Sequence, residues 1–276
     1  YNICLGIGMF LYALIGLFFL RKILLNYFKD STVAILLIAY VFGSNYLNYS
    51  SIDQAMTHNS LFTIYTLLIF TTIQFYKSPN FKKTFLIGCL TGLATLIRPT
   101  DIISILIPLC WNISSLKDFK NRISFLKINI PIVVFAVIPF VLIIFIQPLY
   151  WKFATGNWIV YSYQDQGFNW FKPHVLNYAF SYRSGWLLFC PMLLFAFIGI
   201  VPFIQMRKNL LAVLAFFFLN FYIVTAWDVW DYGGRAMIQS YPILAFPFAA
   251  LIEKVNQRKY LMYLFYPVFI LFLYLN

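Results

Sequence analysis

Residues 225–243 gather several kinds of side chain that could do chemistry, between two apolar runs. They include two tryptophans, two aspartates, a Gly-Gly pair and an arginine: Trp227, Trp230, Asp228, Asp231, Gly233, Gly234 and Arg235. The aspartates and the arginine can satisfy one another, and adjacent glycines permit positive φ angles and a close approach of the backbone. The stretch is therefore either a solvated turn or part of a binding site.

Two other short stretches combine side chains of complementary chemistry. Asp53 and His58 stand five residues apart, and a carboxylate with an imidazole can hold a divalent cation or relay a proton. An incidental polar turn explains the same pair. Arg98 and Asp101 flank Pro99, and the guanidinium can either receive a phosphate or form a salt bridge with the carboxylate.

Arg183 is the remaining candidate, and it stands just before an apolar run, where an arginine either faces lipid headgroups or contacts a ligand. The sequence contains neither the phosphate-binding loop of nucleotide-driven pumps nor the nucleophile elbow of serine hydrolases, so both classes lose support. All four cysteines lie within apolar runs, so neither a disulfide framework nor a cysteine metal site is indicated.

Membrane helices are the elements that must position these residues. The chain of 276 residues is 62% apolar and only 10% charged, whereas a soluble domain is about 45–50% apolar and about 25% charged. A helix needs about 20 apolar residues to cross a bilayer. The apolar runs predict one all-α transmembrane domain, 1–276, with ten segments: 1–20, 33–49, 60–76, 85–97, 102–113, 128–150, 186–206, 210–227, 236–252 and 260–276.

The net charge of +12 is distributed unevenly between the two sets of connections that alternating segments create. One set holds fifteen lysines and arginines against three acids, and the other holds five of each sign. Basic connections stay on the cytoplasmic side, so the excess indicates orientation and a nucleic-acid partner is not expected. Tyr1 then falls on the outer side, and we expect the chain to lack upstream membrane segments.

The neutral, outer side contains one long connection, residues 151–185, which is rich in Trp, Tyr, Phe and Asn. Aromatic residues favour the membrane interface, so we expect a folded external segment with short interfacial helices. Residues 85–97 and 102–113 are too short to span alone, and Pro99 forbids one continuous helix through both. Arg98 is therefore expected below the outer surface, at the mouth of a cavity.

The order of these motifs resembles that of a known family. "SIDQAMTHNSLF", "GLATLIRPTDII", "SYRSGWLLFCPM" and "AWDVWDYGGRAMIQSYPILAFPFAALIE" follow one another along the chain. Together they are similar to the bacterial polytopic membrane glycosyltransferases of the GT-C superfamily, and most of all to the glycosyltransferase 39-like, protein O-mannosyltransferase-related group. The resemblance covers most of the chain, although each motif is short.

The resemblance implies inverting transfer of a sugar from a polyprenyl-phosphate donor to a glycan, lipid or protein acceptor at the outer face of the bacterial inner membrane. The family's catalytic aspartate lies in the first external loop, which would fall upstream of Tyr1. Asp53 and His58 would then hold a divalent metal ion. The donor and acceptor would contact Arg98, Asp101, Arg183, Trp227, Asp228, Trp230, Asp231 and Arg235. A ligase or polymerase of lipid-linked oligosaccharides, or a flippase-type transporter, is the alternative.

Overall fold

The computed structural model describes all residues except 1, 54–55, 162, 164 and 229–231, and the described part is all-helical, as expected. The only β-type pairing in that part is an isolated antiparallel bridge between Phe168 and Trp227. The elements of the first half are α1 (Asn2–Leu24), α2 (Asp30–Phe42), η1 (Asn48–Ile52), α3 (His58–Lys77), α4 (Phe81–Ile97), η2 (Pro99–Ile105), α5 (Leu106–Cys110), α6 (Leu116–Ile128), α7 (Ile130–Ile144) and α8 (Ile146–Thr155).

The second half is more interrupted than the first. Between residues 156 and 174 the described chain is irregular, and a series of short helices follows. The elements are α9 (Val175–Phe180), α10 (Trp186–Phe189), η3 (Pro191–Leu193), α11 (Leu194–Ile198), α12 (Ile200–Met206), α13 (Leu210–Ala226), η4 (Tyr232–Ser240), α14 (Tyr241–Asn256) and α15 (Lys259–Leu275).

Fewer helices are of membrane-spanning length than the ten segments expected. Within the described residues, three are both long and apolar enough: Ile3–Leu24, Ile130–Thr155 and Gly233–Asn256. Five other apolar helices have 10–17 residues. One expected segment, 186–206, is divided at Pro191, where a new helix begins, because proline cannot continue the hydrogen bonding of a helix interior. Pro99 separates α4 from η2, as expected.

A helix also forms where a simple basic connector was expected. Residues 116–128 form α6, whose side chains are all at least partly exposed. Ser115 begins this helix by accepting a hydrogen bond from the backbone N–H of Asp118, at 3.2 Å, which satisfies one of the free donors of the first turn. Hydrogen bonds from the Ser115 hydroxyl and the Ser114 backbone in turn lower the pKa of the Asp118 carboxyl.

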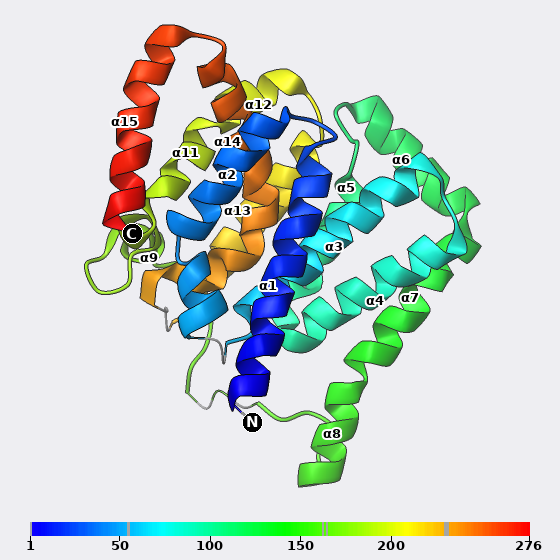
Figure 1. Cartoon of the computed structure of the whole chain (residues 1–276). Helices are drawn as coiled ribbons and strands as arrows, with labels where there is room; N and C mark the ends of the chain where they lie inside the picture. Colours follow the sequence, from blue (N-terminus) through cyan, green and yellow to red (C-terminus); the bar gives the residue numbers. More distant parts are fainter. Residues whose placement is uncertain (1, 54–55, 162, 164, 229–231) are drawn as a thin grey trace.

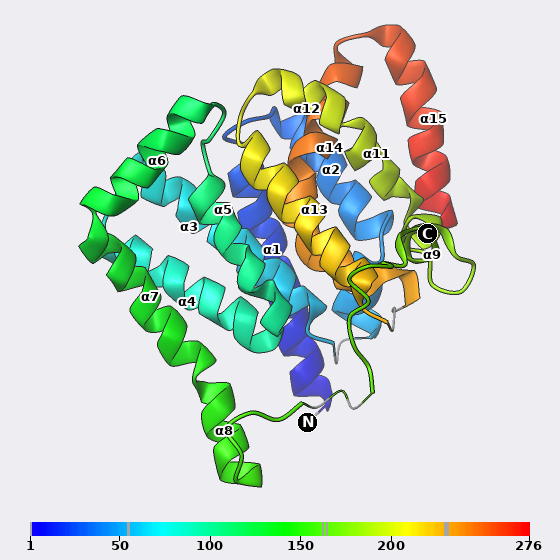
Figure 2. The ribbon, with the colours of Figure 1, turned by 180° about the vertical axis from the view of Figure 1, so that it is seen from behind.

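The connections assigned to the basic set lie together at one end of the bundle. The α1–α2, α12–α13 and α14–α15 connections are all at the upper end in Figure 1, and Figure 2 shows the same arrangement from behind. The Thr32 hydroxyl donates to Glu253 Oε2 at 2.7 Å, and Asn209 Nδ2 donates to Tyr27 Oη at 3.2 Å. Hydrogen bonds thus join basic connections to one another.

Connections of the neutral set meet at the other end. Asn45 Nδ2 donates to the Gly233 carbonyl at 2.8 Å, and the terminal Asn276 donates to the Ser44 carbonyl at 3.0 Å. The chain begins at this end, below the body of the bundle in Figure 1. The division of connections that the charges predict is therefore also a division in space.

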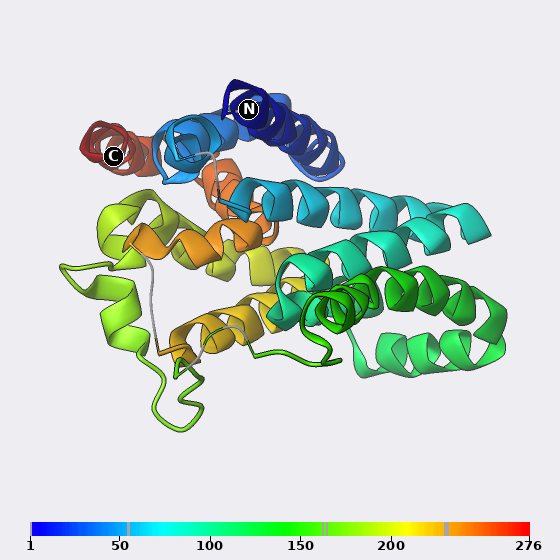
Figure 3. The ribbon, with the colours of Figure 1, turned by 90° about the horizontal axis from the view of Figure 1, so that it is seen from below.

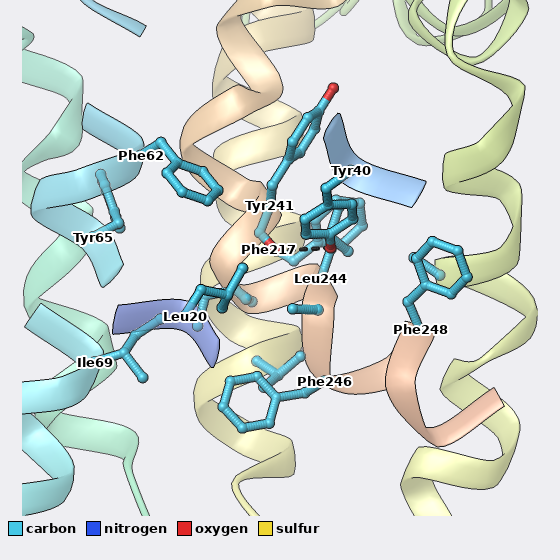
Figure 4. Close-up of a cluster of buried hydrophobic side chains, with 14 of the residues drawn as sticks. Leu20, Tyr40, Phe62, Tyr65, Ile69, Phe217, Tyr241, Leu244, Phe246 and Phe248 are labelled. Atoms are coloured by element: carbon cyan, nitrogen blue, oxygen red, sulfur yellow. Dashed lines mark hydrogen bonds between the residues drawn. The ribbon is translucent and has the colours of Figure 1, made fainter. Parts of the chain in front are cut away.

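Helix α14 is the centre of the bundle, and most of its residues are buried. It packs against α2, α11, α12 and α13, and Figure 3 shows it from below, between α2 and α13. Figure 4 shows Tyr241, Leu244 and Phe246 of α14 among aromatic side chains from neighbouring helices. The Tyr40 hydroxyl donates to the Tyr241 carbonyl at 2.8 Å, which joins α2 to the start of α14.

Glycines allow α4 and α7 to pack unusually closely. A Cβ atom on Gly88 would lie 2.0 Å from the Ala136 carbonyl oxygen, and one on Gly92 would lie 3.2 Å from Phe140 Cα. Small residues four apart let two helices approach closely in a membrane bundle. Since α7 and α8 together are otherwise hardly buried, this contact fixes their position against the body.

Substituting Gly88 with alanine should therefore destabilise the protein. Overpacking of this kind costs about 1–3 kcal/mol, whereas Gly→Ala in an unobstructed helix gains up to about 1 kcal/mol. Gly8 in α1 is the matched control, because a Cβ atom at that position would meet no atom of the described residues within 4 Å. Thermal unfolding of the detergent-solubilised protein should show a lower midpoint for G88A and no loss for G8A; equal midpoints would contradict the close contact.

Candidate functional site

The helical structure is interrupted before Pro99, and an arginine lies at the interruption. Helix α4 ends at Ile97, Arg98 is extended at φ −141°, and Pro99 begins η2. The break is closed by a hydrogen bond from the Asp101 N–H to the Arg98 carbonyl, at 2.8 Å. The partly buried Arg98 guanidinium makes no hydrogen bond or ion pair with any residue that the structure describes. The expected interruption is confirmed, and its cation is available to a ligand.

Asp101 does not form the salt bridge with Arg98 that was one interpretation of this pair. Asp101 is fully buried, and its Oδ1 accepts a hydrogen bond from Gln239 Nε2 at 3.0 Å. Arg98 still acts on this carboxylate electrostatically. The buried carboxyl group therefore has a hydrogen bond from η4 and a cation near it, which lower the cost of its burial.

Further buried polar groups surround Asp101. Gln239 Nε2 also lies 3.5 Å from Asn220 Oδ1, and Asn220 Nδ2 donates to the Ser240 hydroxyl at 2.8 Å. The Tyr65 hydroxyl lies close to Asp101 and Ser104. Four oxygens, Tyr65 Oη, Asp101 Oδ2, Ser104 Oγ and Gln239 Oε1, are buried without a partner in hydrogen-bonding geometry among the described residues. Such a cluster is costly to bury, and it lies where α3, η2, α13 and η4 meet.

The Gly-Gly pair makes the turn that leads to Arg235. Gly233 and Gly234 both have positive φ angles, 61° and 63°. A Cβ atom on Gly234 would lie 2.3 Å from Trp186 Cβ, whereas one on Gly233 would meet nothing in the described chain closer than 3.9 Å. The Gly233 carbonyl accepts from Asn45, which itself accepts from the Tyr241 hydroxyl at 2.6 Å. Backbone conformation and close packing thus explain the pair.

His58 is the point at which two of the sequence clusters converge. It begins α3, is 2% exposed, and packs edge-on to Tyr49 with ring centroids 5.5 Å apart. The charges of both Arg98 and Arg235 act on its ring. Arg235 is partly buried on η4, which packs against α3. The electrostatic influence of two cations from distant parts of the sequence therefore reaches one imidazole.

The metal interpretation of Asp53 and His58 stays a prediction. Asp53 ends η1 and is partly exposed. No group of three His, Cys, Asp or Glu side chains that could hold a metal ion occurs in the described ranges. The two arginine charges near His58 favour an anion over a cation at this position, because like charges repel strongly where water is scarce.

Trp227 and Asp228 belong to a different contact, with the external segment. Asp228 Oδ1 lies 3.9 Å from His174 Nε2, so its side chain faces the external segment. Trp227 pairs with Phe168 through the isolated bridge and packs edge-on against its ring, at 4.7 Å. Trp230 and Asp231 lie outside the described residues. The residues expected to bind donor and acceptor together are thus divided: Trp227 and Asp228 contact the external segment, whereas Arg235 lies on η4.

Arg183 lies neither with the His58 cluster nor with the contact between Trp227 and the external segment. It is exposed in the turn before α10, which fits the interpretation of a headgroup-facing arginine. Two surface cavities also lie away from Arg98. One, of about 310 Å³, is lined by Pro173 and His174. The other, of about 330 Å³, adjoins Arg122, whose guanidinium donates to the Trp111 carbonyl at 2.9 Å and so stabilises the end of α5.

Sequence reasoning missed the residues that join the clusters. Gln239, Asn220 and Tyr65 each carry a polar group into the buried centre. Two of them could have been noticed, because Gln239 and Asn220 are single amides in otherwise apolar runs, and polar residues in such runs are usually functional or paired. Their partners could not have been chosen, since Gln239 and Asp101 are 138 residues apart.

Comparisons with known proteins identify no relative: no family model, curated protein or solved structure matches the chain. A functional hypothesis for this protein therefore depends on the residues around His58, Arg98 and Arg235 and on the apolar composition of the chain.

The two glycines of the turn should respond differently to alanine. Both positions have a positive φ, which costs a non-glycine residue about 1–2 kcal/mol, but only Gly234 lacks room for a Cβ atom. G234A should therefore lower the free energy of unfolding by about 1–3 kcal/mol more than G233A. Thermal unfolding of both variants side by side checks this difference, and equal losses would mean that Trp186 does not constrain the turn.

Proposed function

We propose that this protein is a membrane glycosyltransferase, which transfers a sugar from a polyprenyl-phosphate donor to an acceptor at the outer face of the membrane. The observation that supports the proposal is that Arg98 and Arg235, on connections that the charge pattern assigns to the outer side, both act electrostatically on the buried His58. Two guanidinium groups suit a phosphate, since arginine binds phosphate through paired hydrogen bonds.

The proposal includes ten membrane segments in alternating directions, with the basic connections in the cytoplasm. It is supported by three apolar helices of spanning length, by five shorter ones, and by the gathering of basic and neutral connections at opposite ends of the bundle. Breaks in helices at membrane depth are tolerated where protein or a cavity satisfies the backbone. The break at Pro99 and the turn at Gly233 are of this kind.

The chemistry is an inverting displacement at the anomeric carbon. A carboxylate base takes the proton of the acceptor hydroxyl, the acceptor oxygen forms the new bond to the anomeric carbon, and the bond from that carbon to the phosphate oxygen breaks. The leaving lipid phosphate carries the developing negative charge. Arg98 and Arg235 would stabilise that charge, and preorganised cations in a site of low dielectric do so effectively. No residue of this chain is assigned as the base.

Replacing either arginine should impair transfer. Loss of one preorganised donor to a developing negative charge costs about a hundredfold in kcat, so R98A and R235A should each reduce sugar transfer from a radiolabelled polyprenyl-phosphate sugar by about that factor. R258A is the matched control, because Arg258 is exposed on the α14–α15 connection. Unchanged turnover in R98A and R235A, with an active control, would remove both arginines from the site.

Chelation separates the two interpretations of His58. If the arginine charges stabilise the phosphate, turnover should stay within about twofold after treatment with EDTA, since no metal then shares the charge. If Asp53 and His58 hold a divalent ion, EDTA should abolish turnover, Mg²⁺ or Mn²⁺ should restore it, and D53A should mimic the treatment. We expect the first result, and the second would replace it with the metal interpretation.

A further inference from the structure

Helix α6 presents an exposed apolar stripe, formed by Leu116, Phe119, Ile123 and Leu126. At about 3.6 residues per turn, their spacing places these four side chains on one face of the helix. Leu116 is 82% exposed, Phe119 46% and Ile123 39%, and Leu126 is partly exposed. A surface helix of a soluble domain turns its polar face outward, whereas α6 exposes its apolar one.

A different face of α6 holds the helix to the body of the bundle. Arg122 donates to the Trp111 carbonyl at 2.9 Å, and its guanidinium lies 4.0 Å from the centre of the Tyr76 ring. The Phe125 ring packs against that of Phe75, with centroids 6.4 Å apart. Because Arg122 and Phe125 are three residues apart, they mark one side of the helix, and the apolar stripe is turned away from it.

Exposed lysines border the apolar stripe. Lys117, Lys120 and Lys127 are exposed, and none of them forms a salt bridge within the described residues. Lys120 and Lys127 lie within about 40° of Leu116 around the helix axis. The only acid of α6, Asp118, accepts hydrogen bonds at the start of the helix. Lysine side chains beside an apolar face can extend along it and place their ammonium groups in a polar layer.

Helix α6 begins beside another basic connection, at one end of the bundle. The Ser114 hydroxyl donates to the Arg207 carbonyl at 2.7 Å, and the Asn112 N–H donates to Asn209 Oδ1 at 3.1 Å. Figure 1 shows α6 at the upper end, where it slants across the direction of α1. The charge pattern assigns this end to the cytoplasmic side, and the cytoplasmic leaflet of a membrane contains anionic lipids.

We propose that α6 is an interfacial helix. Its apolar stripe enters the boundary between headgroups and acyl chains, while Lys117, Lys120 and Lys127 bind anionic headgroups. Helices of this class combine an apolar face with lysines and arginines. The lysines favour lipid over a second copy of the chain, because pairing two stripes would bring like charges together, whereas an anionic surface attracts them. The inference is independent of sugar transfer, since it uses no residue around His58.

The first test compares the full-length protein in nanodiscs of phosphatidylcholine alone and in nanodiscs that also contain anionic phosphatidylglycerol. Hydrogen exchange of the α6 amides is measured for the wild type and for K120Q/K127Q. K82Q/K259Q is the matched control, because it removes the same charge from two exposed lysines outside α6.

In the wild type, the α6 amides should exchange more slowly in the anionic nanodiscs than in the neutral ones, and high salt should reduce the difference. Each lysine near an anionic surface contributes about fivefold to binding, so K120Q/K127Q should lose most of this protection and K82Q/K259Q should keep it. Equal exchange of the wild type in both kinds of nanodisc, or an equal loss in the control variant, would overturn the inference.

The second test asks which face of α6 meets the lipid. A fluorescent amino acid in place of Phe119 should be quenched by lipids with brominated acyl chains. The same amino acid in place of Ser124, which is exposed but lies off the apolar stripe, should instead be quenched by iodide in the water. Quenching of both positions by iodide alone would overturn the inference. Crosslinking of two copies through residue 119, without lipid quenching, would assign the stripe to a dimer and overturn it as well.

Discussion

Polar groups in an apolar bundle must find their partners within the protein, and this constraint organises the structure. At Pro99 and at Gly233–Gly234 the helices are interrupted, so backbone groups that a continuous helix would pair are left to other partners. The Asp101 N–H closes the first break onto the Arg98 carbonyl, and Asn45 covers the Gly233 carbonyl at the second. Arg98 directly precedes the first interruption and Arg235 directly follows the second. The buried hydrogen bond between Gln239 and Asp101 joins the two interrupted segments. The cations are therefore held by the same contacts that satisfy the breaks.

The electrostatic consequence is a group of charged side chains around His58 that would favour a bound anion. The charges of Arg98 and Arg235 act on the buried His58 imidazole, and Arg98 also acts on the buried Asp101. A buried carboxylate and nearby guanidinium groups interact more strongly than they would in water, but each also loses hydration. Because the Arg98 guanidinium has no hydrogen-bond partner within the described residues, a ligand phosphate would supply interactions that the protein alone leaves unmade. The same arrangement disfavours a bound cation beside His58.

Much of the architecture could be predicted from the sequence, but the contacts that join the distant segments of the candidate site could not. Composition predicts an all-α bundle, Pro99 predicts the break, and the charge pattern predicts which connections lie together, because each of these depends on local residue chemistry. Three helices of the described residues, and not ten, are long and apolar enough to span, and Pro191 divides the expected segment 186–206. Residues 116–128, whose charges predicted a connector, form α6, which Ser115 caps. The pairing of Gln239 with Asp101, the packing of Gly234 on Trp186 and the position of His58 near two arginines all depend on segments distant in the sequence, which no local pattern specifies.

Photocrosslinking with a polyprenyl phosphate tests the central claim most directly. A polyprenyl phosphate with a photoreactive group next to the phosphate would be added to the full-length protein in nanodiscs, and the crosslinked peptides would be identified by mass spectrometry. The account predicts crosslinks to the peptides that contain His58, Arg98 and Arg235, and their loss when excess unlabelled polyprenyl phosphate competes. Crosslinks confined to the basic connections at the other end of the bundle, such as those around Arg207 and Arg258, would contradict it.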